Sequence, residues 1–270
     1  MKPSQAPNSV YTKILRKALI STEWDYSDFC CLFTWWCRVI GAGSFGRVHL
    51  AQHRKTQRIY VIKMISKAMC IREGQVSTML SGYPSLPPLK GKVKWKHPFL
   101  VNLKAAFQDK ACLYLVLEYV PGGDFFGFLQ KVTALKEDHA RFYAAQIILG
   151  LECLHARNIA FRDLKPENML VDGEGYVKIT DFGFTKVVNG ATYTFCGTPD
   201  YIAPEIILNK GHGPAVDYWS LGCMIYEMLH GLPPFYSGPN LAIFGGSVTR
   251  NFSEPPWPPR AQSVFCSPLL

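Results

Sequence analysis

The sequence lacks an apolar run long enough to cross a lipid bilayer. The longest one near the N-terminus extends from Phe29 to Cys37, whereas a membrane-spanning helix needs about 20 apolar residues. Neither a signal-peptide pattern nor the glycine that N-myristoylation requires is present. We therefore expect a soluble protein of the cytoplasm, with the nucleus as a further location, and no membrane partner.

Metal-ligand spacing of cysteines is absent as well. The nine cysteines are scattered and odd in number, and the adjacent Cys30 and Cys31 cannot form a C-x-x-C hook. This pattern predicts reduced thiols. Acidic residues are outnumbered by basic ones, 20 against 29, so the net charge is +9. We expect this charge to lie mostly on solvated faces, with no nucleic-acid partner.

The predicted secondary structure changes along the chain. Residues 1–34 form an extension, and residues 35–120 contain strand-like segments at 39–40, 48–50, 60–64, 100–107 and 113–118. Within them, residues 72–97 form an atypical insert with Pro84, Pro87 and Pro88, which exclude a continuous helix. Residues 121–250 are helix-rich, notably at 142–154 and 216–229, and residues 251–270 form a tail with five prolines. This order predicts an α+β fold of two lobes facing a cleft.

A glycine-rich stretch lies between two of the strand candidates. Residues 41–48 read G-x-G-x-x-G-x-V, a spacing that lets backbone amides approach phosphate oxygens. By itself the stretch is equally consistent with a dinucleotide site or a plain glycine hairpin. A dinucleotide site wants a helix next and an acidic residue about 20 positions on. Here a strand and Lys63 follow, which favours a nucleotide phosphate held by this lysine.

Two further segments carry charged and polar groups that suit phosphate chemistry. In the segment 161–168, Asp163 can accept the proton of an attacking hydroxyl, Asn168 can bind Mg²⁺, and Lys165 can neutralise a moving phosphoryl group. Asp181, in Asp181-Phe182-Gly183, is an oxygen ligand of the type Mg²⁺ prefers. Taken singly, a charged loop is often only solvated, and D-F-G is a common turn.

Together these segments resemble the signature of the protein kinase family. The order also includes Gly197-Thr198-Pro199 and Ala203-Pro204-Glu205, and the resemblance covers about residues 35–250. Residues 118–124 and 194–199 are similar to the cyclic-AMP-dependent catalytic subunits and their AGC-group relatives. The resemblance implies a two-lobed fold with a small antiparallel sheet lobe and a larger helical lobe. It also implies ATP and Mg²⁺ as cofactors, and serine or threonine hydroxyls of proteins as acceptors. A cyclic-AMP-binding regulatory subunit is the further partner that it suggests.

The resemblance also assigns roles to residues of this sequence. The catalytic residues would be Asp163, Lys165 and Lys63, and the metal ligands Asn168 and Asp181. Asp217 would brace the catalytic loop from below. ATP would contact Gly41, Ala42, Gly43, Ser44, Phe45, Gly46, Val48, Val61, Lys63, Leu117, Glu118, Val120 and Asp124. Thr194 would be the activation-loop phosphosite, paired with Arg162 and Lys186. Substrate would contact Asp124, Glu167, Glu227 and Thr198, with a preference for basic residues before the phosphoacceptor.

The sequence departs from this family pattern in three places. Pro88 stands where a glutamate should pair with Lys63, and Glu73 is the only acidic residue between Lys63 and Asp109. The glutamate of the A-P-E segment, Glu205, has only Arg250 and Arg260 downstream of it as arginine partners. The large lobe is therefore expected to be incomplete. If Glu205 is buried without a partner, the free energy of unfolding is expected to fall by about 3–5 kcal/mol. These departures leave two hypotheses open: an active kinase, and a catalytically impaired module that binds nucleotide, regulatory subunit or substrate.

Overall fold

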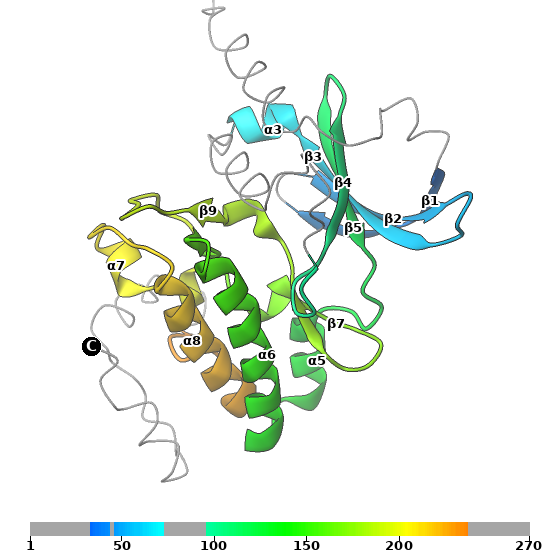
Figure 1. Ribbon diagram of the computed structural model, residues 1–270. Coiled ribbons are helices and arrows are strands. Elements are labelled where there is room, and N and C mark those ends of the chain that lie inside the picture. Colours follow the sequence, from blue (N-terminus) through cyan, green and yellow to red (C-terminus); the bar gives the residue numbers. More distant parts are fainter. Residues whose placement is uncertain (1–32, 44–45, 73–95, 237–270) are drawn as a thin grey trace, which may run out of the picture.

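The computed structural model describes residues 33–43, 46–72 and 96–236, and Figure 1 shows them as a sheet set against a group of helices. The sheet is formed by residues up to Glu118, and every described helix except the short α3 comes after it. This arrangement confirms the α+β, two-lobed fold expected from the sequence. The extension at 1–32, most of the insert (73–95) and the segment 237–270 lie outside the described residues. The domain boundaries set from the sequence therefore stay predictions.

The small lobe is one antiparallel sheet with the strand order β1-β2-β3-β5-β4. Its strands are β1 (Phe33–Gly43), β2 (Gly46–His53), β3 (Ile59–Ser66), β4 (Leu103–Gln108) and β5 (Cys112–Glu118). The helix α3 (Lys67–Arg72) follows β3. The middle of β5 is buried on both faces, because one face packs with Phe107 and the other joins the main core. The sheet is thus held by apolar side chains on both of its sides.

The large lobe is built around two long helices, α6 (Glu137–His155) and α8 (Val216–His230). Figure 1 shows α5 (Phe125–Val132) and α8 on either side of α6, and the short α7 (Pro204–Ile207) near one end of α8. Along the chain, four short strands follow α6 and precede α7. β6 (Ile159–Ala160) pairs with β9 (Lys186–Val187), and β7 (Met169–Val171) pairs with β8 (Val177–Ile179). Three 3₁₀ turns, η1 (Pro166–Asn168), η2 (Phe182–Phe184) and η3 (Pro199–Tyr201), complete this region.

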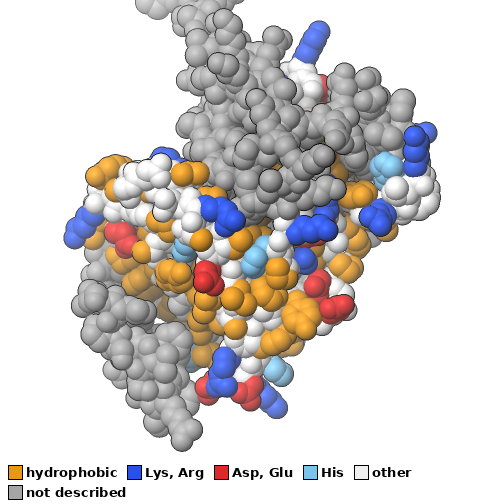
Figure 2. Space-filling view, in the orientation of Figure 1, with side chains coloured by type: hydrophobic (Ala, Val, Ile, Leu, Met, Phe, Trp, Pro, Cys, Tyr) orange, Lys and Arg blue, Asp and Glu red, His pale blue; other side chains and the backbone are white. Residues whose placement is uncertain are grey.

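The helical periodicity predicted α6 and α8, but one face of α6 is less buried than expected. Phe142, Ile148 and Leu149 are 42–47% exposed, and Figure 2 shows hydrophobic side chains exposed over the helical lobe. The opposite face carries Ile147, Leu151 and Leu154, which are fully buried. Apolar residues therefore occupy both faces of α6, although only one face lies in the core.

The strand expected at residues 100–107 begins later than its apolar pattern suggests. β4 starts at Leu103, and the residues just before it pair with the large lobe instead. Val101 N donates to Ile179 O at 2.9 Å, and Ile179 N donates to Phe99 O at 2.8 Å. The segment 99–101 thus forms an isolated parallel β-bridge with Ile179 of β8, which ties the chain before β4 to the large lobe.

The structure bears on two further expectations, the state of the cysteines and the lack of a membrane-spanning helix. The cysteines whose state the structure records, Cys70, Cys112, Cys153, Cys196 and Cys223, are all free thiols, as the scattered pattern predicted. Across the described ranges, no helix combines the length and the apolar character that a bilayer crossing requires. A cytoplasmic location stays a prediction.

Candidate active site

The glycine-rich stretch connects two paired strands rather than a strand and a helix. Gly43 at the end of β1 faces Gly46 at the start of β2, and Ser44 and Phe45 between them lie outside the described residues. A Cβ on Gly46 would lie 1.7 Å from Met64 O, so only glycine allows β2 to approach β3 this closely. Since a strand follows, the dinucleotide reading is excluded, and a glycine hairpin remains, either plain or covering a phosphate.

Lys63 reaches from the sheet to the metal-ligand candidate of the large lobe. It lies in the middle of β3, between Val48 of β2 and Leu115 of β5. Its Nζ is 2.6 Å from Asp181 Oδ1, and both side chains are partly exposed, at 19% and 41%. A cation and a carboxylate from opposite lobes therefore meet where a nucleotide phosphate and its metal ion would bind.

Asp163 is the centre of a hydrogen-bond network formed by the catalytic loop. Its Oδ1 accepts from Thr198 Oγ1 at 2.8 Å, and its Oδ2 accepts from Asn168 Nδ2 at 2.8 Å. Lys165 Nζ lies 3.4 Å from Asp163 Oδ2 and donates to Thr198 Oγ1 at 2.7 Å. The structure thus brings together four residues that were predicted from two separate motifs.

The environment of Asp163 makes this carboxyl a better base. Burial raises its pKa, while Lys165, Thr198 and Asn168 act to lower it, and the nearby charge of Asp181 adds to the rise. A carboxylate with a raised pKa holds a proton more readily than a solvated one. The network therefore orients Asp163 while its burial favours proton acceptance.

Asn168 and Asp181 lie at corresponding ends of two paired strands. Asn168 directly precedes β7, Asp181 lies two residues after β8, and Met169 of β7 faces Ile179 of β8. Asp181 adopts a left-handed conformation, with φ of 59°, and its Oδ1 accepts from Gly183 N at 3.3 Å. Within the described ranges, no three His, Cys, Asp or Glu side chains form a metal cage.

Asp217 holds the catalytic loop from below, and the contact expected for it is present. Its carboxylate is fully buried and accepts from Phe161 N at 2.8 Å and from Arg162 N at 2.7 Å. His155 Nε2 lies 2.7 Å from the same carboxylate. Arg162 has a positive φ of 70°, a strained conformation for a residue with a side chain. The two hydrogen bonds from backbone N–H groups stabilise this strained turn.

The hinge between the lobes is held by a network that the sequence did not reveal. Leu117 and Val120 are buried, and Val61 and Val48 are partly buried on the neighbouring strands. Glu118 Oε1 accepts from Asn102 Nδ2 at 2.8 Å and lies 3.3 Å from Lys178 Nζ on β8. Glu118 therefore anchors the hinge to the strand that leads into Asp181.

The three acidic residues assigned to substrate differ in their surroundings. Glu167 and Asp124 are exposed, and Asp124 caps α5 by accepting from Gly127 N at 2.7 Å. Glu227, in contrast, is buried and accepts from Tyr201 Oη at 2.5 Å. Burial raises the pKa of Glu227 to about 7, and the charges of Glu167 and Asp200 add to the rise. Glu227 is thus a buried carboxylate whose charge is opposed by its surroundings.

The activation segment places the predicted phosphosite in a cationic environment. Thr194 is partly buried, and its Oγ1 lies 3.4 Å from Thr192 Oγ1. Lys186 Nζ donates to Thr192 Oγ1 at 2.7 Å. Arg162 Nε donates to Phe184 O at 2.8 Å, whereas Arg162 Nη1 is buried without a hydrogen-bond partner. Neither Lys186 nor Arg162 forms an ion pair with an acidic side chain in the described part of the chain.

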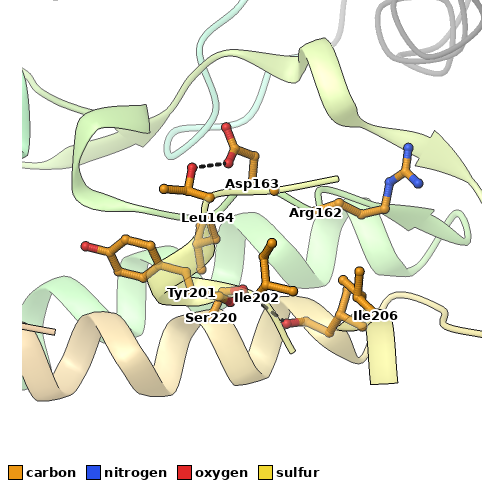
Figure 3. A pocket seen from close by; sticks show the side chains of 10 residues that line it. Arg162, Asp163, Leu164, Tyr201, Ile202, Ile206 and Ser220 are labelled. Carbon is orange, nitrogen blue, oxygen red and sulfur yellow. Dashed lines mark hydrogen bonds between the residues drawn. The ribbon is translucent and has the colours of Figure 1, made fainter. Parts of the chain in front are cut away.

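A small cavity lies beneath the catalytic loop, between it and α8. Its lining includes Asp163, Thr198, Tyr201 and Ile202. In Figure 3 the side chains of Arg162 and Asp163 point in different directions, and Asp163 accepts the hydrogen bond from the activation segment. The side chains of these two adjacent residues thus face different surroundings.

The departures from the family pattern are only partly visible. Glu73 and Pro88 lie outside the described residues, so the expectation that Lys63 lacks a helix partner stays a prediction. Glu205 is partly buried, and no residue in the described ranges forms an ion pair with it. Arg250 and Arg260 lie outside those ranges.

Sequence reasoning missed Tyr201, Asp200, Lys178 and His212, which contact or influence the residues of the site. Each acts on a residue far away in the chain, as Lys178 does on Glu118, 60 positions apart. The only local signal was that Asp200 and Tyr201 directly follow the Gly197-Thr198-Pro199 segment.

With this geometry in place, the comparisons with known proteins identify the class. Residues 36–256 match the family "Protein kinase domain", and this chain belongs to that family.

The relatives define the branch of the family more narrowly. The chain is 51% identical to the cAMP-dependent protein kinase catalytic subunit of Dictyostelium discoideum over 218 residues, covering 81% of this chain and 33% of the relative. It is 40% identical to the cAMP-dependent protein kinase type 3 of Saccharomyces cerevisiae, covering 91% and 59%. It is 44% identical to the serine/threonine-protein kinase sgk-1 of Caenorhabditis elegans, covering 82% and 45%. The chain thus spans between a third and three fifths of the length of these curated relatives.

Proposed function

We propose that this chain is a serine/threonine protein kinase that transfers the γ-phosphoryl group of ATP to hydroxyl groups of protein substrates. The observation that carries the proposal is the network in which Asp163 is bound by Thr198 and Asn168, with Lys165 3.4 Å away. This network orients one carboxylate as a base and keeps a cation beside it. Those are the groups that phosphoryl transfer to a hydroxyl requires.

The residues of the cleft fit ATP and Mg²⁺. Mg²⁺ would neutralise charge on the transferred group, and Asn168 and Asp181 are the oxygen ligands available to hold it. Lys63 Nζ, 2.6 Å from Asp181 Oδ1, would bind the phosphates from the sheet side. For adenine, we propose the hinge backbone at Glu118 and Val120, beside the buried Leu117. No described residue supplies a backbone acceptor for Val120 N–H, which supports this assignment.

The reaction follows from what each residue does. Asp163 accepts the proton of the substrate hydroxyl, and the hydroxyl oxygen then attacks the γ-phosphorus. The bond from this phosphorus to the β–γ bridging oxygen breaks, and ADP leaves. Lys165 offsets negative charge on the moving group, while Thr198 keeps both Asp163 and Lys165 in place. The proton on Asp163 is released to solvent after the product departs.

We further propose a preference for basic residues before the phosphoacceptor. Glu227 supports it, because a buried carboxylate whose only side-chain donor among the described residues is a neutral hydroxyl favours a cationic partner. Glu167, whose charge acts on Glu227, and Asp124 are exposed acids that can add to it. By similarity to relatives named as cAMP-dependent, a cyclic-AMP-binding regulatory subunit is also a proposed partner. Binding to such a subunit that cyclic AMP releases would support this partnership, and cyclic-AMP-insensitive binding would contradict it.

Activity is tested with radiolabelled ATP and a peptide that carries arginines before its serine. The wild-type chain should incorporate phosphate, and Asp163→Asn should reduce kcat by at least about 100-fold, because it removes the proton acceptor. A matched peptide with alanines in place of arginines should show a higher KM. Equal activity of wild type and Asp163→Asn would refute the assignment of Asp163.

Nucleotide binding is measured separately, by thermal unfolding with Mg²⁺·ATP. A ligand at 100 times its Kd stabilises the folded chain by about 2.7 kcal/mol. The stabilisation should disappear in both Lys63→Ala and Asp181→Ala. Nucleotide binding without phosphate incorporation by the wild type would instead favour the alternative, a binding module without turnover.

A further inference from the structure

We propose that His212 is a phosphate-binding side chain, which together with Arg162 and Lys186 receives a phosphate carried by Thr194. The inference rests on the proposed function, since it concerns the activation segment of that kinase. It assigns to His212 a role that neither its position in the sequence nor any family motif suggested.

Two polar side chains in this region are buried without a hydrogen-bond partner for one nitrogen each. Arg162 is 3% exposed and its Nη1 has no partner, and His212 is 5% exposed and its Nε2 has none. Leaving a buried polar nitrogen unsatisfied costs about 1–3 kcal/mol. Two such groups in one region indicate that a ligand with hydrogen-bond acceptors completes the site.

His212 is joined to the activation segment through its backbone, and the charges of Arg162 and Lys186 act on its side chain. Thr192 and His212 form a two-way backbone bridge, with N···O distances of 2.8 and 2.9 Å. The hydroxyl of Thr192 accepts from Lys186 and lies 3.4 Å from that of Thr194. A phosphate on Thr194 therefore lies next to the residue that both His212 and Lys186 already contact.

The electrostatics of the site require an anion of more than one negative charge. The cations are Arg162 and Lys186, and the acid that influences His212 is Asp217, which is already bound to the backbone of the catalytic loop. Burial first, and then the charges of Arg162 and Lys186, lower the pKa of His212 to about 4. His212 is thus neutral as long as these cations lack an anion. A phosphate, with a charge of about −1.5 to −2, would reverse this balance and allow His212 to take up a proton.

Thr194 rather than Thr192 is the residue that carries the phosphate. Thr192 is 5% exposed and its hydroxyl is already bound to Lys186, so a modifying enzyme cannot reach it without opening the segment. Thr194 is only partly buried, and its neighbours Tyr193 and Phe195 are 64% and 58% exposed. The structure therefore offers the Thr194 hydroxyl at the surface and the receiving groups beneath it.

The proposal predicts that phosphorylation and protonation are linked. Without phosphate, the pKa of His212 lies below its value in the unfolded chain, so this histidine lowers stability as the pH falls from about 6.5 toward 4. With phosphate, the folded pKa lies above 6.5, and the histidine adds stability at low pH that is lost as the pH rises through it. The gain in melting temperature on phosphorylation should therefore be larger at pH 6 than at pH 8.

The test uses the full chain with phosphothreonine incorporated at position 194, as wild type and as His212→Gln. The ³¹P NMR titration of the phosphate and the NMR titration of ¹⁵N-labelled histidine are recorded for each. In the wild type, the pKa of His212 should rise above 6.5 on phosphorylation, and the second pKa of the phosphate should be lower than in His212→Gln by on the order of one unit. The histidine titration alone decides the question if His212→Gln fails to fold.

Two outcomes overturn the proposal. One is a His212 signal that titrates at the same pH with and without the phosphate. The other is an unchanged phosphate titration in a folded His212→Gln chain. Peptide phosphorylation is measured on the same samples, so that a failure of the proposed kinase activity can be told apart from a failure of the role of His212. Absence of activity in every sample refutes the proposed function, whereas activity with an unresponsive His212 refutes only the role of this histidine.

Discussion

The catalytic loop and α8 carry two kinds of buried charge, which differ in where their partners lie. Asp163 and Asp217 have their partners inside the chain, from Thr198 and Asn168 for the first and from backbone N–H groups for the second. Arg162 and Glu227 are buried as well, yet neither has a charged partner among the described residues. The first kind holds the loop in its working shape. The second kind suits charged groups that come from outside the chain or from its modification.

This comparison predicts that removing an internally bound carboxylate has the largest effect on stability. Asp217→Ala would leave two buried backbone N–H groups without acceptors, and the free energy of unfolding should fall by about 3–5 kcal/mol. Urea denaturation measures this change. The control is Asp138→Ala, which removes a carboxylate that is 87% exposed and should change the value by about 0.5 kcal/mol or less. Similar losses in both variants would contradict the distinction.

A second prediction concerns the effect on catalysis of the hydrogen bonds that hold Asp163 inside the chain. Thr198→Val removes the hydroxyl that donates to Asp163 and accepts from Lys165, and kcat should fall about 10- to 100-fold. Thr198→Ser keeps the hydroxyl and should recover most of the lost rate. Steady-state kinetics with the arginine-rich peptide would measure both variants. Equal rates for the valine and serine variants would show that the hydroxyl has no such role.

The third prediction concerns Glu227, a buried carboxylate without a charged partner among the described residues. With a pKa of about 7, this carboxyl is mostly ionised at pH 8 and mostly neutral at pH 6. KM for the arginine-rich peptide should therefore rise by up to about tenfold over this range, and Glu227→Gln should show a high and pH-independent KM. A titrating KM in Glu227→Gln would assign the effect to another group.

Glu227 also predicts a contrast in stability. Its pKa rises from 4.5 to about 7 on folding, so this carboxyl lowers the free energy of unfolding as the pH increases through that interval. Glu227→Gln should therefore lose no stability at pH 8, in contrast to Asp217→Ala. A loss of several kcal/mol would place Glu227 among the internally bound carboxylates.

The smallest expected effect concerns how the burial of an ion pair changes its contribution to the free energy of unfolding. Lys178 and Glu118 are partly exposed, at 16% and 21%, with their charged atoms 3.3 Å apart. Lys178→Met should cost about 1 kcal/mol in free energy of unfolding, against about 0.3–0.5 kcal/mol for Arg141→Met, whose ion pair on α6 is more exposed. Thermal or urea unfolding of both variants would test the ranking.

The sequence could indicate that the residues of the candidate site lie together, because they occur in short motifs of fixed order. Asp163, Asn168 and Asp181 were each found from their immediate neighbours, and the structure brings them together as expected. The contacts that it did not predict join distant residues, such as Tyr201 with Glu227 and Thr192 with His212. Such pairs depend on how helices and loops pack, and a local pattern carries no information about that.

The start of β4 shows the same limit in the backbone. Residues 100–107 were predicted as one strand, but Asn102 hydrogen-bonds Glu118, and the residues before it pair with β8. A sequence pattern predicts an extended segment, although it does not say which strand that segment will join. Only the three-dimensional arrangement decides between the two neighbours.

The bridge between residues 99–101 and β8 has a consequence for attempts to divide this protein. A fragment cut at the hinge, beginning near residue 121, would lose these two backbone hydrogen bonds although every catalytic-loop residue would remain in it. The β8 edge would then present unpaired N–H and C=O groups, which readily pair with other chains. A separately expressed large lobe should therefore aggregate, unless residues 96–102 are supplied to it as a peptide or joined to it by circular permutation.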